Sequence, residues 1–170
     1  MFHFMLTRCL CPCHALIFKR SLFTNAGYFD ETMRSCEDWD MWLRITATGA
    51  RFKRIDGFFA CYRMQPESMT CNYNRMLSHG YRVITKHSHL HKNCQSCIQA
   101  AQHGKRNFSY YVWNLTQGPQ VNRLYNERSY WRLLCNLVSC SKADKLWLWW
   151  GIRRIGRLVR DTVRNHDNKP

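Results

Sequence analysis

No stretch of this sequence is apolar over the roughly 18–20 residues that a membrane-spanning helix needs. The longest candidate, Leu146–Ile152, is far shorter. No secretory signal is visible either, because the apolar segment Met1–Leu6 is short and has no basic lead-in. These two absences predict a cytoplasmic chain.

A disulfide framework is not expected, although the sequence has ten cysteines. Cys9, Cys11 and Cys13 alternate too closely to pair with one another, and the remaining cysteines are scattered. Reduced thiols are typical of a cytosolic compartment, where disulfides are rare. The cysteines therefore support the same localisation as the missing signal.

Acidic residues are scarce, with 11 Asp and Glu against 26 Lys and Arg and a formal net charge of +15. The imbalance is uneven, since residues 1–70 have a net charge of +2 and residues 71–170 one of +13. Carboxylates cluster only at Glu37, Asp38 and Asp40. With 45% hydrophobic residues the chain is globular, and the charge pattern predicts two parts that meet near residue 70.

The acidic cluster lies where a helix is expected to begin and to run to about Thr48, before Gly49. Apolar side chains follow at helical spacing, and Ser35 stands three residues before Asp38, as in a capping box. Acids on a first turn meet the positive end of the helix dipole. Asp38 could therefore serve as a base or simply as a cap, whereas Asp40 is expected to pair with Arg44 one turn later.

Three short runs have the apolar or alternating pattern of strands. A short helix over Ser21–Asn25, ended by Gly27, separates the first run from the acidic helix. Strand, helix, turn, helix, strand and strand together predict a partial α/β domain over residues 1–70, followed by a helical basic extension over residues 71–170. The predicted strands are residues 15–18, 51–56 and 58–62.

Four blocks of the first part resemble the acceptor half of family 2 glycosyltransferases. They are Ala-Leu-Ile-Phe-Lys-Arg at 15–20, Ala-Gly-Tyr-Phe-Asp-Glu at 26–31, Glu-Asp-Trp-Asp-Met-Trp-Leu-Arg at 37–44, and Tyr-Arg at 62–63 with Ser-Met-Thr at 68–70. The resemblance covers roughly residues 10–70. It implies a GT-A fold, a Rossmann-like α/β sandwich, and an inverting transfer from a nucleotide-sugar donor to a hydroxyl of a glycan or lipid-linked acceptor.

The resemblance also implies roles for individual residues. Asp38 would be the general base for the acceptor hydroxyl, and Glu37 would orient Asp38 or the acceptor. Trp39 would offer the acceptor sugar a flat apolar face. Arg63 and Ser68 would lie near the donor phosphates, where a cation offsets charge on the leaving diphosphate.

The family's first half, with its nucleotide-binding strands and metal-binding Asp-x-Asp, has no counterpart here. We therefore interpret the chain as a fragment or truncated form with little transfer of its own, and expect Mg or Mn only with the missing half. Residues 38–40 spell Asp-x-Asp, but side chains two apart on a helix diverge by about 200°. Gln65 also stands where the family often has His. No metal is predicted at this site.

A second interpretation belongs to another class of protein. Three histidines and a C-x-x-C lie within eleven residues, at His87, His89, His91, Cys94 and Cys97, and such side chains bind zinc. Cys9, Cys11, Cys13 and His14 could complete a site. A strong zinc signature has two knuckles and this sequence has one, so an ordinary helix–helix turn with buried thiols competes. The alternative function is a zinc-stapled basic helical module that binds nucleic acid or an anionic membrane.

The second part is expected to be helical throughout. A helix is predicted over residues 75–85, and helical hairpins over residues 99–137 break at Gly118-Pro119. Aromatic and arginine side chains in the hairpins could stack on nucleic-acid bases, but we expect them to pack the extension and expect no nucleic acid. Residues 141–165 predict a basic amphipathic helix with a tryptophan cluster, which would bind an anionic membrane or pack on the domain.

Overall fold

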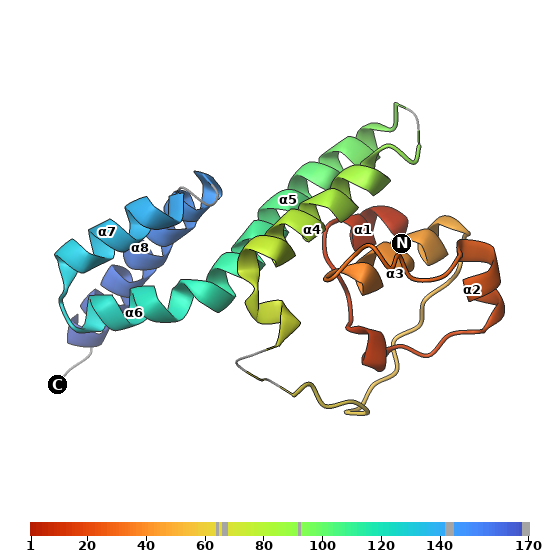
Figure 1. Cartoon of the computed structure of the whole chain (residues 1–170). Coiled ribbons are helices and arrows are strands. Elements are labelled where there is room, and N and C mark those ends of the chain that lie inside the picture. The colour runs from red at the N-terminus through yellow and green to blue at the C-terminus, as the bar shows by residue number, and fades with distance from the viewer. Residues whose placement is uncertain (64, 66–67, 92, 142–144, 168–170) are drawn as a thin grey trace. The chain divides into compact units, whose positions relative to one another are not determined.

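The computed structural model describes residues 1–63, 65, 68–91, 93–141 and 145–167. Within these ranges every regular element is a helix and none is a strand (Figure 1). The α/β prediction, and the Rossmann-like sandwich with it, is therefore wrong. The helices are α1 (Phe2–Leu6), η1 (Cys13–Ala15), α2 (Ser21–Ala26), α3 (Glu37–Ala47), η2 (Met69–Cys71), α4 (Tyr73–Ser88), α5 (Gln95–Thr116), α6 (Gly118–Asn126), α7 (Tyr130–Ser141) and α8 (Lys145–Asp167).

The segments predicted as strands are irregular. Ile17 is 94% exposed, and Phe58 is fully exposed. A strand needs a neighbouring strand to accept and donate its backbone hydrogen bonds, and none of the described residues supplies one. A short apolar run cannot show by its pattern alone whether such a neighbour exists.

The chain divides into two compact units, an N-terminal unit of Met1–Phe108 and a C-terminal unit of Ser109–Pro170. The sequence predicts a boundary near residue 70 instead. Residues 71–108 belong to the first unit because α4 packs against both α1 and α3. Gly80 of α4 also lies against the Phe108 ring of α5, so that α4 and α5 run side by side (Figure 1).

Helix α3 is the centre of the N-terminal unit. Beyond its acidic first turn most of its side chains are apolar, and α1, α2 and α4 all contact it. The Trp39 indole N–H donates to the Met5 carbonyl of α1 at 2.8 Å, and that of Trp42 donates to the Cys11 carbonyl at 3.1 Å. The side chains of α3 that are at most 1% exposed are Trp39, Asp40, Met41, Trp42, Leu43 and Ile45.

The two ends of α3 differ in how far the sequence predicts them. Gly49 follows the helix with a φ of +83°, which confirms its predicted role as the terminator. The capping box predicted from Ser35 is wrong. The N-cap is Cys36, which has a left-handed φ of +60° and provides no side-chain hydrogen bond to the helix.

The C-terminal unit is a cluster of α6, α7 and α8 with the end of α5. Its buried side chains include Trp113, Val121 and Leu137. The predicted break at Gly118 is confirmed, because α5 ends at Thr116 and α6 starts at Gly118. The sequence also favours a helix cap at Asp144, but this residue lies outside the described residues.

Two further expectations concern solvent and thiols. No helix in the described part of the chain has both the length and the apolar character to cross a membrane. The nine cysteines that the structure describes are all free thiols, as the sequence predicts.

Candidate functional site

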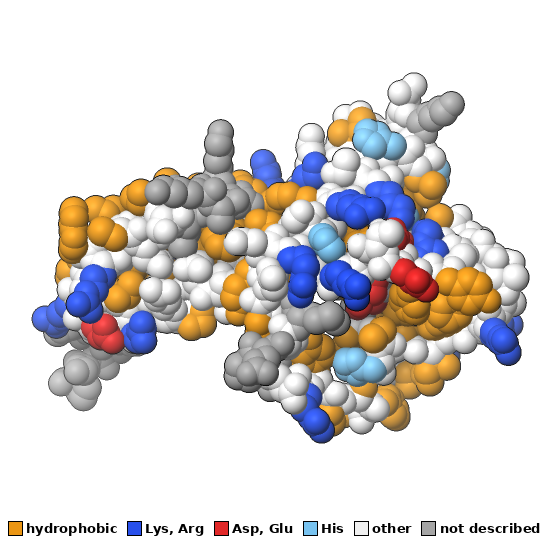
Figure 2. Space-filling model, in the orientation of Figure 1, with side chains coloured by type: hydrophobic (Ala, Val, Ile, Leu, Met, Phe, Trp, Pro, Cys, Tyr) orange, Lys and Arg blue, Asp and Glu red, His pale blue; other side chains and the backbone are white. Residues whose placement is uncertain are grey.

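The acidic cluster of α3 lies at one end of the central helix of the N-terminal unit. On the face drawn in Figure 2, acidic side chains are few, and most of them lie in one group flanked by Lys and Arg. The three carboxylates of α3 have different surroundings. Their contacts show which of these carboxylates have a structural role.

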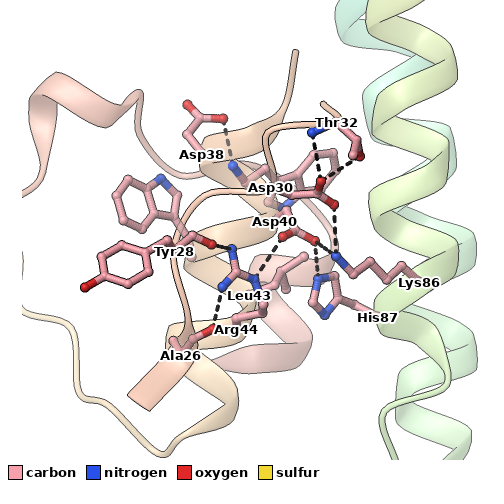
Figure 3. A network of polar contacts seen from close by, with 12 residues as sticks. Ala26, Tyr28, Asp30, Thr32, Asp38, Asp40, Leu43, Arg44, Lys86 and His87 are labelled. Carbon is pink, nitrogen blue, oxygen red and sulfur yellow. Dashed lines mark hydrogen bonds and ion pairs between the residues drawn. The ribbon is translucent and has the colours of Figure 1, made fainter. Parts of the chain in front are cut away.

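Asp40 is fully buried and is bound by one arginine, one lysine and one histidine side chain (Figure 3). Its Oδ1 atom accepts from the Lys86 Nζ and the His87 Nε2 of α4, each at 2.9 Å. Its Oδ2 atom accepts from the Arg44 Nε, also at 2.9 Å. The predicted ion pair with Arg44 is confirmed, and the two partners from α4 tie this helix to α3.

The network continues from Arg44 and Lys86 into the loop after α2. Arg44 donates to the backbone carbonyls of Ala26 and, at 2.7 Å, of Tyr28. Lys86 also lies 3.6 Å from the Asp30 carboxylate. The segment that joins α2 to α3 is thus held by side chains from α3 and α4.

The pKa of Asp40 shows the outcome of these contacts. Burial alone would raise it, but the hydrogen bonds from His87, Lys86 and Arg44 outweigh burial and hold the pKa well below its usual range. Asp40 therefore stays ionised and paired. Its carboxylate is fully buried and already accepts three hydrogen bonds, so its role is structural.

Asp38 points away from this network (Figure 3). Its Oδ1 atom accepts the backbone N–H of Trp39 at 2.7 Å. Burial raises the pKa of Asp38, and the charge of the neighbouring Glu37 raises it further, against the hydrogen bond from Trp39. The Oε2 atom of Glu37 is buried, and no hydrogen-bond partner for it lies among the described residues.

Three thiols lie close to Asp38. Burial raises the pKa of Cys36 to about 12, and the negative charge of Asp38 adds to this effect. Burial and the Asp38 charge likewise raise the pKa of Cys9 and Cys11. These thiols stay protonated at neutral pH and are therefore poor nucleophiles; Cys11 and Cys36 are half-buried, and the side chain of Cys9 is exposed.

The other residues predicted for the site lie apart from Asp38. Trp39 is fully buried, and its ring packs against Phe108 at 5.2 Å, so it supports the site from within the core and offers no face to a ligand. Arg63 is exposed and, among the described residues, makes no ion pair with the acids of α3. Ser68 is half-buried and shares a 2.7 Å hydrogen bond with Thr70.

The cysteine and histidine residues considered for zinc are brought together only in part. His91, Cys94 and Cys97 lie together, but the fourth member of their cluster is His3 of α1 rather than any residue of 9–14. His87 is engaged by Asp40 instead. Nothing in the spacing of the sequence points to His3, because more than eighty residues separate it from the other three.

Sequence reasoning also misses Lys86 and His87 as partners of Asp40. The only available signal is that an acid flanked by the apolar residues Trp39, Met41 and Trp42 is expected to be buried and then needs partners from another element. No protein-family model, curated protein or solved structure matches this chain.

Proposed function

We propose that this chain contains the acceptor side of a glycosyltransferase site, with Asp38 as its general base. The proton of an acceptor hydroxyl would pass to the Asp38 carboxylate as that oxygen forms a bond to the anomeric carbon of a nucleotide-sugar. The bond from that carbon to the donor phosphate would break, and the nucleoside diphosphate would leave with its electron pair. Such a single displacement inverts the anomeric centre.

The observation that carries this proposal is the difference between Asp38 and Asp40. Asp40 has three side-chain partners, Arg44, Lys86 and His87, whereas Asp38 has a raised pKa and accepts only backbone N–H groups. A base works best when its pKa lies near the working pH, and burial beside another carboxylate moves Asp38 in that direction. Glu37 would orient Asp38 from the preceding position, because its own Oε2 atom is buried and does not face a sugar.

In this proposal the donor diphosphate binds between α3 and η2, near Arg63 and Ser68. Arg63 is an exposed cation with no acidic partner among the described residues, so its charge is available to a phosphate. Ser68 offers a hydroxyl on the same loop. A divalent cation, Mg or Mn, is expected only together with the donor-binding half of such an enzyme, which has no counterpart in these residues.

Acceptor binding can be tested without a donor. Labelled protein would be applied to an array of glycans and lipid-linked sugars, and Asp38→Asn would be compared with Asp56→Asn, an exposed acid paired only with Arg54. A hydrogen bond to a charged group contributes about 1.5–3 kcal/mol, so Asp38→Asn should weaken binding roughly 10- to 100-fold. Asp56→Asn should bind like the unchanged protein.

Two results would contradict the proposal. One is an array on which the unchanged protein binds no glycan. The other is a glycan bound equally well by Asp38→Asn, which would leave Asp38 as a backbone cap. If a glycan binds and Asp38→Asn weakens its binding, sugar transfer to that glycan would be assayed with UDP-, GDP- and dTDP-sugars. The measured product would be the released nucleoside diphosphate.

We further propose that residues 141–165 bind an anionic membrane surface, with the protein on its cytoplasmic side. The apolar stripe predicted for this segment is not fully packed, since Ile152 is 57% and Val159 45% exposed on α8. Arginines lie beside it, and the Arg153 guanidinium stacks 4.5 Å above the Trp149 ring. Exposed apolar and basic side chains on one helix are typical of helices that lie in a membrane interface.

Vesicle flotation tests this second proposal. The protein should float with vesicles of phosphatidylcholine and phosphatidylglycerol and not with phosphatidylcholine alone. Each basic residue near an anionic surface contributes about 1 kcal/mol, so Arg157→Gln with Arg160→Gln should weaken binding about 30-fold. The matched control is Arg51→Gln with Lys53→Gln, two exposed cations of the other unit. Equal loss in both pairs would contradict a site on α8.

A further inference from the structure

The connection between α4 and α5 brings three zinc-type ligands onto one short turn. Cys94 precedes the first residue of α5, and the Cys97 N–H donates to the Cys94 carbonyl at 3.0 Å. The Cys94 N–H in turn donates to the His91 carbonyl at 3.2 Å. These backbone bonds fold His91, Cys94 and Cys97 into a knuckle whose side chains point the same way.

The fourth side chain is distant in sequence and comes from the first helix of the N-terminal unit. His3 of α1 places its Nε2 atom 3.3 Å from the Cys97 Sγ and 3.6 Å from the Cys94 Sγ. The His91 Nδ1 lies 3.3 Å from the Cys97 Sγ. All four ligand atoms lie within 4.8 Å of one another.

These separations fit a tetrahedral ion. With Zn–S bonds of about 2.3 Å and Zn–N bonds of about 2.0 Å, a sulfur and a nitrogen on a tetrahedron are about 3.5 Å apart. The three S···N distances in the structure, 3.3, 3.6 and 3.3 Å, lie within a few tenths of an ångström of that value.

We propose that His3, His91, Cys94 and Cys97 bind one structural zinc ion. Two thiolates and two neutral imidazoles in a tetrahedral arrangement favour zinc over the harder divalent ions. Both thiols release their protons on binding, and the two thiolate charges balance the charge of the ion. Four protein ligands leave no position for water or substrate, so the site is structural rather than catalytic.

The zinc ion would hold α1 in place. This helix has five residues and no side-chain cap, too few to be stable alone, yet Met5 and Leu6 are fully buried in the core. The Met5 carbonyl also accepts the Trp39 indole N–H. A bond from His3 to the α4–α5 turn therefore fixes α1 over α3, the helix that carries Asp38.

Metal content is the first test. The protein would be expressed in zinc-supplemented medium and purified without a chelator. Elemental analysis should then give about one zinc ion per chain. His3→Ala and Cys97→Ser should lose the ion. The matched controls His89→Ala and Cys61→Ser change exposed residues outside the cluster and should keep it. Replacing Cys11 and Cys13 with Ser should also leave the content unchanged.

Thiol protection gives a second measurement that needs no variant. In the native zinc-loaded protein, alkylation followed by peptide mapping should modify the exposed Cys61 and Cys135 and spare Cys94 and Cys97. Chelation should make Cys94 reactive. Replacement of zinc by Co²⁺ should add the absorption bands of a tetrahedral thiolate complex.

Three outcomes would overturn the proposal. The first is protein that holds no zinc after growth in zinc. The second is zinc that is kept by His3→Ala but lost when Cys11 and Cys13 are replaced. The third is Cys94 that is alkylated equally with and without chelator, since this would show that the thiols are not ligands even if a variant fails to fold.

Discussion

At the scale of single residues, the carboxylates of α3 show how two acids in one helical turn acquire opposite effects on stability. The folded state lowers the pKa of Asp40 and raises that of Asp38. A lowered pKa means that ionisation favours folding, and a raised pKa means that ionisation opposes it. Asp38 therefore weakens the fold at neutral pH, which is typical of residues retained for function.

Asp38→Asn should accordingly raise the melting temperature at pH 7, or leave it unchanged. Asparagine keeps the oxygen that accepts the Trp39 N–H but cannot ionise. The gain should vanish as the pH falls below the ordinary pKa of an aspartate, because both Asp38 and its replacement are then neutral. Thermal melts over a pH series measure this. A fall in melting temperature at pH 7 would contradict this expectation, because it would show that the ionised Asp38 stabilises the fold.

Asp40→Asn should have the opposite effect. Asparagine gives Arg44, Lys86 and His87 a neutral amide with one acceptor oxygen in place of the carboxylate, and breaking a buried pair costs about 3–5 kcal/mol. We expect about 3 kcal/mol, because Lys86 and Arg44 are partly exposed. In the unchanged protein this contribution is complete above the ordinary pKa of aspartate and declines as the pH falls below it.

Urea denaturation of Asp40→Asn at pH 7 gives the comparison. The matched control is Asp56→Asn, whose exposed pair with Arg54 should contribute at most about 1 kcal/mol. If the two variants unfold at the same urea concentration, the network around Asp40 does not stabilise the fold.

At the scale of helices, local patterns predict the elements whose bonds are local. Helix α2, the body of α3 and α4 were all expected from their periodicity, and Gly27, Gly49 and Gly118 mark the expected ends. The strands failed because their hydrogen bonds would have needed a distant partner. The same limit applies to the site, where His3, Lys86 and His87 are brought in by packing over forty residues or more.

The contact between α1 and α5 gives a prediction at this scale. A Cβ atom at Gly104 would lie 2.3 Å from the backbone carbonyl oxygen of Leu6, and backbone cannot rotate away as a side chain can. Gly104→Ala should therefore push α1 from α5 and cost about 1–3 kcal/mol. A Cβ atom at Gly156 on α8 would meet only the Arg160 guanidinium, at an ordinary contact distance of 3.6 Å, so Gly156→Ala should be neutral or stabilise by up to about 1 kcal/mol.

Chemical denaturation of both variants measures the difference, and zinc content adds a second readout. Because α1 carries His3, Gly104→Ala should also weaken zinc retention, whereas Gly156→Ala should not. A Gly104→Ala protein as stable as the unchanged one would mean that α1 does not lie against α5.

At the scale of the whole molecule, the division at Phe108 separates the proposed chemistry from the proposed membrane contact. Asp38, the Asp40 network and the zinc ligands all lie in the N-terminal unit, and the basic helix α8 lies in the C-terminal unit. Each unit has its own core, with Trp39 and Trp42 in the first and Trp113 in the second. The stability of one unit can therefore change without a change in the other.

Zinc removal tests this independence. A chelator should destabilise only the N-terminal unit, because every proposed ligand lies within residues 3–97. Hydrogen exchange with mass analysis of peptides should then show faster exchange in α1 and at the start of α5, with α6 and α7 unchanged. Calorimetry should show one transition that moves to lower temperature and one that does not. If exchange in α6 and α7 rises together with that in α1, the two units unfold as one, and the metal stabilises the entire chain.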